Sequence, residues 1–228
     1  MKQLKIYSDE RLEGLCIYCG KNPTTRDHVP SKILLDKPYP TNLPVVPCCK
    51  KCNEGFSLDE EYFSCFIECV IAGSTEPNQL GRNKIKRILA NRPKLKARIQ
   101  NSMTIKDDRT YFSPESDRIQ DVNLKLAKGH ATYENSEIQI ETPICISIDF
   151  LSTMTETDKI DFFSLDQGLL PEVGSRALQR IFNEDKGYEN GWVKVQENNY
   201  MYSINHGFDG LNIKFLIRDY LACKVVWN

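Results

Sequence analysis

The chain has 228 residues, of which 40% are hydrophobic and 27% are charged, so it can bury a core and lacks the composition of a disordered protein. It contains no run of 18 apolar residues, and its N-terminal residues are charged, which argues against a membrane-spanning helix and a secretory signal. We therefore expect a soluble, cytoplasmic protein without a membrane partner.

Positive charge is concentrated in one part of the chain. Residues 77–106 carry nine basic and no acidic side chains, whereas residues 107–228 carry 12 basic and 20 acidic side chains. A basic segment of this kind predicts an element that faces a polyanion. From charge and motifs together we expect three parts, at residues 1–75, 76–106 and 107–228.

The first quarter of the chain holds two Cys-x-x-Cys pairs, Cys16 with Cys19 and Cys49 with Cys52. Four thiolates at these spacings can bind one zinc ion tetrahedrally, and a segment with so little apolar periodicity needs a metal to fold. Cys48 competes with Cys49 as a ligand, but only Cys49 has the two-residue spacing to Cys52. The odd total of nine cysteines argues against a framework of disulfides.

A helix is expected after the cysteine-rich segment. Ser57 and Glu60 have the spacing of a capping box, and Gly73 ends the apolar pattern. Cys65 and Cys69 are interpreted as buried small hydrophobic residues. Apolar residues at helical spacing indicate core packing, and they are Tyr62, Phe63, Phe66, Ile67, Val70 and Ile71.

The basic segment is also predicted to be helical. Ile85, Ile88 and Leu89 give residues 83–90 one apolar side, and Pro93 is suited to open a second helix. A solvated helix surface is the alternative to a nucleic-acid contact, although the segment has no acidic residue to alternate with the basic ones. The candidate DNA-binding side chains are Lys84, Lys86, Arg87, Lys94, Lys96 and Arg98.

The last part of the chain predicts a mixture of helices and strands. Helices are expected at residues 119–133 and 175–182, and β-structure at residues 143–148, 192–196, 200–204 and 211–227. No catalytic motif is visible here, and His130 and His206 are interpreted as structural or unassigned. The expected fold class is α+β.

An ordered set of motifs accompanies the cysteine pairs: Asp27-His28-Val29-Pro30, then Asn42-Leu43, then Asn53 directly after Cys52. In this order, together with the cysteines, they resemble the HNH endonuclease family of the ββα-metal fold, over roughly residues 14–57. The resemblance implies an N-terminal ββα-metal zinc module, followed here by the helical middle region and the α+β C-terminal region.

The resemblance also implies roles. His28 matches the general base that activates water, and Asn42 matches the residue that orients it. Asp27 and Asn53 match the ligands of a catalytic Mg²⁺ or Mn²⁺, while the four cysteines match structural zinc knuckles. These residue types suit phosphodiester hydrolysis, because imidazole accepts a proton near neutrality and a divalent ion neutralises phosphate charge.

One position departs from the family. Phe56 stands where the family often has a lysine, three residues after the last motif Asn. We therefore expect phosphate contacts to come from Lys50, Lys51 or the stretch at residues 82–98.

The sequence thus predicts a metal-dependent endonuclease that acts on DNA, leaving RNA open, with the basic helices holding the backbone. By analogy, such an activity suits an effector of a bacterial anti-phage or toxin system, and the C-terminal region would then bind a protein partner. The alternative is a non-catalytic zinc ribbon that binds nucleic acid or protein. Such a module would have no need of Asp27, His28 and Asn53.

Overall fold

The computed structural model describes residues 14–41, 43–107, 109–164, 170–171, 174–183, 187–207 and 210–228. The fold mixes helices and strands, as the expected α+β class requires. It divides into two compact units, the first formed by residues up to Glu54 with Asn123–Asn228, the second by Gly55–Val122. The division expected at residues 75 and 106 stays a prediction. No helix in the described part of the chain is both long and apolar enough to cross a membrane.

The first unit begins with a two-stranded antiparallel pair. Strand β1 (Thr25–His28) pairs with β2 (Val45–Cys48), and the register sets His28 opposite Val45. Helix α2 (Lys50–Ala72) follows β2 after one residue. The expected helix start at Ser57 is therefore wrong, because Cys49 directly precedes the helix and Cys52 already lies in its first turn. The expected end at Gly73 is confirmed, where the backbone turns at a φ of 62°.

Six strands between Cys145 and Trp227 form an antiparallel sheet with the order β5-β10-β9-β8-β7-β6. The predicted β-structure is confirmed, although the first strand begins two residues later than expected and residues 211–227 make a hairpin. Gly210 has a φ of 104°, and a Cβ there would lie 1.9 Å from the Trp227 carbonyl oxygen. The strands are β5 (Cys145–Phe150), β6 (Tyr188–Glu189), β7 (Trp192–Gln196), β8 (Tyr200–Gly207), β9 (Gly210–Ile217) and β10 (Leu221–Trp227).

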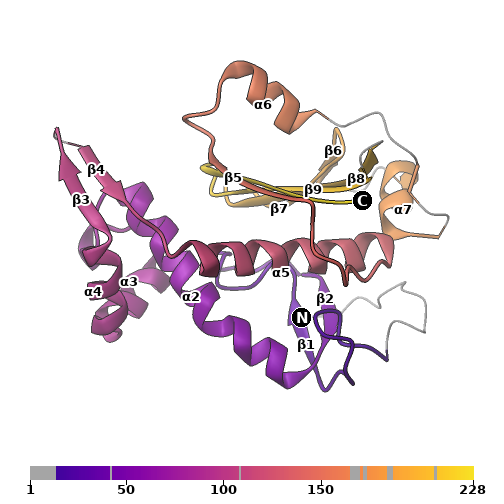
Figure 1. Cartoon of the computed structure of the whole chain (residues 1–228), viewed down its shortest axis with the longest axis horizontal. Helices are drawn as coiled ribbons and strands as arrows, with labels where there is room; N and C mark the ends of the chain where they lie inside the picture. Colours follow the sequence, from indigo (N-terminus) through magenta and orange to yellow (C-terminus); the bar gives the residue numbers. More distant parts are fainter. Residues whose placement is uncertain are drawn as a thin grey trace. The chain divides into compact units, whose positions relative to one another are not determined.

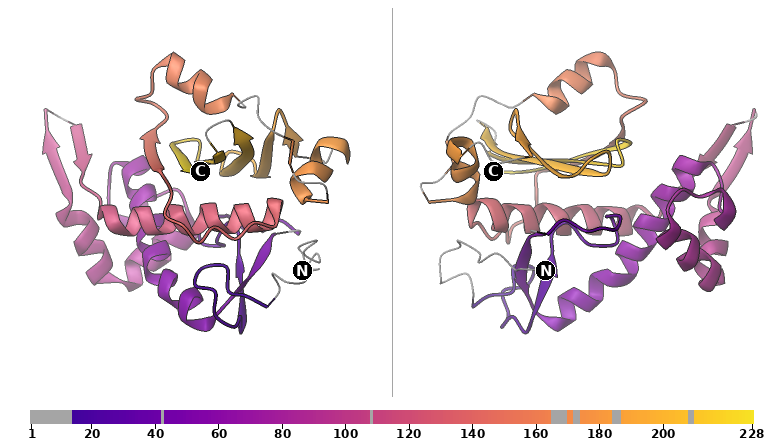
Figure 2. Two further views of the ribbon diagram at one scale, coloured as in Figure 1. Left: turned by 45° about the vertical axis from the view of Figure 1, so that its right-hand side comes forward. Right: turned by 180° about the vertical axis from the view of Figure 1, so that it is seen from behind.

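Three helices accompany this sheet. Helix α5 (Ser116–Asn135), longer than the predicted 119–133, lies from Asn123 onward between one face of the sheet and the β1–β2 pair (Figures 1 and 2). Helix α6 (Glu156–Phe163) covers the opposite face, where Phe162 packs on Trp192. Helix α7 (Arg176–Asn183), expected at 175–182, lies at one end of the sheet.

Both faces of α5 are buried within this unit. Towards β1 and β2, Tyr133 packs with Ile17, Val29 and Val46 in one hydrophobic cluster. Towards the sheet, Glu134 accepts hydrogen bonds from the Tyr202 hydroxyl at 2.6 Å and from the Arg180 guanidinium at 2.8 and 2.9 Å. Because its two sides contact both β elements, α5 joins the N-terminal residues to the C-terminal sheet.

His130 lies on the sheet-facing side of α5 and is fully buried. Its Nε2 lies 2.8 Å from the Tyr200 hydroxyl oxygen, and its ring stacks on Tyr202 with centroids 3.9 Å apart. Burial, together with the charges of Lys125 and Arg180, lowers the pKa of His130 to about 3. The structural interpretation of His130 agrees with this packing.

Stability should fall in mild acid because of His130. The unfolded chain binds a proton at this site near pH 6.5, but the folded chain only near pH 3, so stability is lost as the pH falls between these values. We expect a loss of about 2–3 kcal/mol at pH 4.5 from this group. Urea unfolding of the wild type and of His130→Gln between pH 7 and 4.5 measures it. If the free energy of unfolding depended on pH equally in both proteins, the prediction would be contradicted.

The second unit contains the rest of α2 and the basic segment. Helices α3 (Asn83–Asn91) and α4 (Pro93–Asn101) confirm the two predicted helices, and a short 3₁₀ helix, η1 (Pro77–Gln79), precedes them. Strands β3 (Met103–Lys106) and β4 (Arg109–Phe112) form a hairpin that the sequence did not predict. The aromatic stripe of α2 is largely buried, with Phe66 edge-on to Phe112, although Ile71 is 41% exposed. Cys65 and Cys69 are buried, as predicted.

Candidate metal centre and active site

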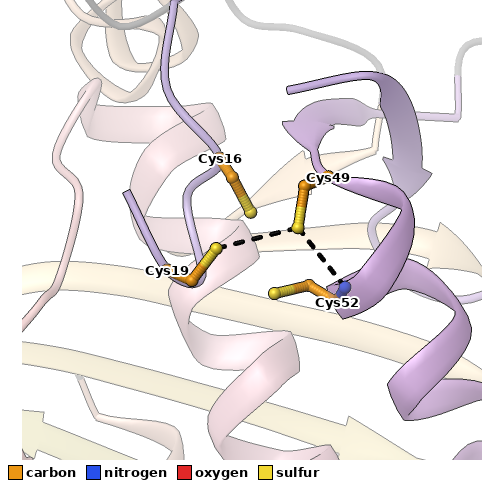
Figure 3. Close-up of side chains that lie close together, drawn as sticks. All are labelled: Cys16, Cys19, Cys49 and Cys52. Carbon is orange, nitrogen blue, oxygen red and sulfur yellow. Dashed lines mark hydrogen bonds between the residues drawn. The ribbon is translucent and has the colours of Figure 1, made fainter. Parts of the chain in front are cut away.

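The loop that carries Cys16 and Cys19 and the start of α2 bring four cysteines together in the first unit (Figure 3). The Sγ atoms of Cys16, Cys19, Cys49 and Cys52 all lie within 4.8 Å of one another. In the first pair, the backbone N–H groups of Cys19 and Gly20 donate to the Cys16 carbonyl, and Gly20 has a φ of 70°. In the second pair, the Cys52 N–H points at the Cys49 Sγ, 3.4 Å away.

The cluster has the dimensions of a zinc site. A tetrahedron with zinc–sulfur bonds of about 2.3 Å has sulfur–sulfur edges of roughly 3.8 Å. The Cys19 and Cys49 Sγ atoms are 3.7 Å apart. The four residues can therefore hold a metal ion such as zinc, as predicted.

The thiols of this cluster differ in acidity. Burial raises the pKa of Cys16, but hydrogen bonds from the backbone of Cys49, Tyr18 and Cys19 outweigh it and leave this pKa at about 7. Burial and the Cys19 and Cys49 side chains raise the pKa of Cys52. Four neighbouring thiols cannot all ionise without a cation, so full ionisation of the cluster requires a bound metal.

Cys48 lies outside the cluster. Its thiol is buried and donates to the Cys49 carbonyl oxygen at 3.3 Å. The choice of Cys49 over Cys48 as the second pair's first member is therefore confirmed.

Asp27 is held from two directions. Its Oδ2 accepts a hydrogen bond from the Tyr18 hydroxyl at 2.8 Å, and Tyr18 lies inside the first cysteine pair. The same oxygen lies 2.8 Å from Nζ of Lys125, which comes from α5. Among the described residues, Oδ1 of Asp27 accepts no hydrogen bond. The first knuckle and α5 thus fix this carboxylate together.

His28 is the half-buried neighbour of Asp27 on β1. Burial lowers the pKa of His28 below its ordinary value, and the charges of Lys32 and Lys125 lower it further, while Asp27 opposes the shift. The imidazole is therefore neutral at pH 7, the form that can accept a proton.

Asn53 lies in the first turn of α2, beside β1. Its Nδ2 donates to Oγ1 of Thr25 at 3.2 Å and to the Arg26 carbonyl at 3.3 Å. These bonds place Asn53 next to the strand that carries Asp27 and His28, although 25 residues separate it from His28 in sequence. With Nδ2 turned to the strand, Oδ1 is the atom left for a ligand. Asn42 lies outside the described residues.

Three further residues at this site belong to no motif that the sequence analysis identified. Tyr18 contacts Asp27, Ser31 contacts Lys125, and Gly129 lets α5 approach the Asp-His segment. A Cβ at Gly129 would lie 2.6 Å from Cγ2 of Val29. Lys125 is the one sequence feature that indicates a buried polar contact here. It interrupts the apolar stripe of α5 between Val122 and Leu126, which are both fully buried.

The predicted DNA-binding lysines and arginines fall into two groups. Lys96 pairs with Glu76 at 2.8 Å and Arg98 with Glu115 at 3.0 Å, so acidic residues from outside the basic segment neutralise both. Lys84 is also engaged within the fold. Within the described chain, Lys86, Arg87 and Lys94 form no ion pair. Lys50 and Lys51 are exposed at the start of α2, where Lys50 lies 3.7 Å from Glu54.

Comparison with known proteins gives no further guide to this site. Neither a family model, nor a curated protein, nor a solved structure matches the chain.

Proposed function

We propose that this protein is a metal-dependent HNH-type endonuclease, with a ββα-metal module at residues 25–72 as its catalytic element. The arrangement of Asn53 supports the proposal most. Its hydrogen bonds to Thr25 and Arg26 tie the start of α2 to the strand that carries Asp27 and His28. Asp27 and His28 thus lie on one strand of a pair that a helix carrying Asn53 follows, in the unit that also holds the cysteine cluster.

The proposed chemistry assigns one task to each residue. The neutral imidazole of His28 takes a proton from the attacking water. Asp27 and Asn53 offer a carboxylate and an amide oxygen, the ligand types that Mg²⁺ and Mn²⁺ prefer. A divalent ion held there would neutralise charge on the phosphate and the leaving oxygen. The cysteine cluster, with zinc bound, fixes the loop that carries Tyr18 against Asp27.

The experiment is incubation of the purified protein with supercoiled plasmid and Mg²⁺ or Mn²⁺. Nicked and linear products that EDTA abolishes would support the proposal, with Asp27→Asn as the inactive control. Nucleic-acid binding without cleavage in either metal would favour a non-catalytic zinc ribbon instead.

We also propose that the second unit holds the DNA backbone through its unpaired cations. Each side chain that contacts a phosphate adds about 0.9 to the slope of log affinity against log salt. Replacing Lys86, Arg87 and Lys94 by Gln should therefore flatten this slope by about 2–3 in cleavage-deficient His28→Ala protein. A salt titration of duplex binding measures it.

A matched control distinguishes phosphate contact from general loss of charge. Lys96 and Arg98 are neutralised within the fold, so replacing both by Gln should change the slope much less. If the double and the triple replacement flattened the slope equally, the phosphate contact would not be specific to the unpaired cations.

A further inference from the structure

Lys125 is a buried cation in contact with the candidate metal ligand. Its side chain is 1% exposed, and its Nζ lies 2.8 Å from Oδ2 of Asp27, whose side chain is 10% exposed. The ammonium also donates to Oγ of Ser31 at 2.6 Å. Lys125 comes from α5, whereas Asp27 and Ser31 lie on β1 and the segment after it.

Electrostatics explains why Lys125 lies beside Asp27. A buried carboxylate without a counter-charge is strongly unfavourable, so Asp27 needs a cation beside it whenever it is ionised. A divalent ion and an ammonium can each meet that need. Both together would bring like charges close in a poorly solvated site, so we expect them to exclude each other.

We propose that Lys125 is a tethered counter-cation of the metal site, which neutralises Asp27 until a divalent ion displaces its ammonium. This inference rests on the proposed function, because it takes Asp27 as a metal ligand. Ser31 is a second acceptor for the ammonium and holds it near the site during the exchange. Lys125 is thus a positioning residue that sets the metal affinity, through competition for the same carboxylate.

The test is the affinity of the zinc-loaded, full-length protein for Mn²⁺, measured by calorimetry and by electron paramagnetic resonance. Lys125→Met removes the competing charge, so it should bind Mn²⁺ at least about tenfold more tightly than the wild type. Lys125→Arg keeps a cation and should bind as weakly as the wild type.

Thermal unfolding gives a second readout. Without Mn²⁺, Lys125→Met should unfold at a lower temperature than the wild type, because Asp27 then lacks a counter-charge. Saturating Mn²⁺ should raise its Tm more than that of the wild type, and adding Asp27→Asn should abolish this gain. Lys125→Gln can still hydrogen-bond to Asp27 and Ser31, and it provides the same comparison if the Met variant does not fold.

Two results would overturn the inference, and they differ in their meaning. Wild-type or weaker Mn²⁺ affinity in both neutral variants would make Lys125 a structural ion pair only. Plasmid cleavage that depends on Mg²⁺ and on Asp27 would then still uphold the proposed function. Absence of Mn²⁺ binding in all variants, with no effect of Asp27→Asn on cleavage, would refute both proposals.

Discussion

Replacing His28 by Ala should reduce plasmid cleavage by about 10²–10⁴-fold, the usual cost of losing a general base. The side chain is half-buried at the end of β1, and its main-chain register with Val45 does not depend on the imidazole. Zinc content, circular dichroism and Tm should therefore stay close to those of the wild type. Single-turnover cleavage in Mg²⁺ measures the rate.

Chemical rescue separates a general base from a structural histidine. Added imidazole should restore part of the rate of His28→Ala, and none of the rate of Asp27→Asn, which lacks the metal ligand. His206→Ala is the matched control, because it removes another half-buried imidazole, bonded to Glu137 at 3.0 Å. If His28→Ala cleaves at the wild-type rate, the assignment of His28 is wrong.

Replacing Cys19 by Ser should remove the metal from the cysteine cluster and unfold the surrounding segment. Structural zinc sites bind with apparent free energies of about 10–16 kcal/mol, comparable to the entire stability of a domain. We expect less than one zinc per chain, a lower Tm and loss of soluble protein. Elemental analysis and calorimetry measure these changes.

Two other cysteines serve as controls for the zinc site. Cys145 is exposed on β5, so Cys145→Ser should retain one zinc per chain and the wild-type Tm. Cys48→Ala should also retain the zinc, since Cys48 lies outside the cluster, although the loss of a buried thiol should lower the Tm slightly. A well-folded wild-type protein that contains no zinc would refute the assignment.

Local spacing allowed part of this structure to be predicted. The cysteine pairs, the two basic helices and the end of α2 at Gly73 follow from residues within a few positions of one another. The start of α2 was misplaced because capping rules look for an oxygen side chain such as that of Ser57, whereas here the Cys49 sulfur faces the Cys52 N–H. Helix α6 was missed, although Thr155 and Asp158 form a capping box that could have been read from the sequence.

Contacts between distant residues could not be predicted in the same way. Ser31 and Lys125 are separated by 94 positions, and no pattern in either segment names the other. A lysine within an apolar helical stripe indicates a buried partner of opposite charge, but it does not identify that partner. Strands β3 and β4 are too short for an alternation of apolar and polar residues to be recognised in the sequence.

The burial of α5 on both faces has a consequence for synthesis of the protein. The Asp-His segment emerges from the ribosome early, but the residues that pack against Val29 and neutralise Asp27 are made about a hundred positions later. A nascent chain ending at residue 75 would expose Ile17, Val29 and Val46 and leave Asp27 without Lys125. The order of translation thus delays completion of the site until Lys125 and Tyr133 have been made.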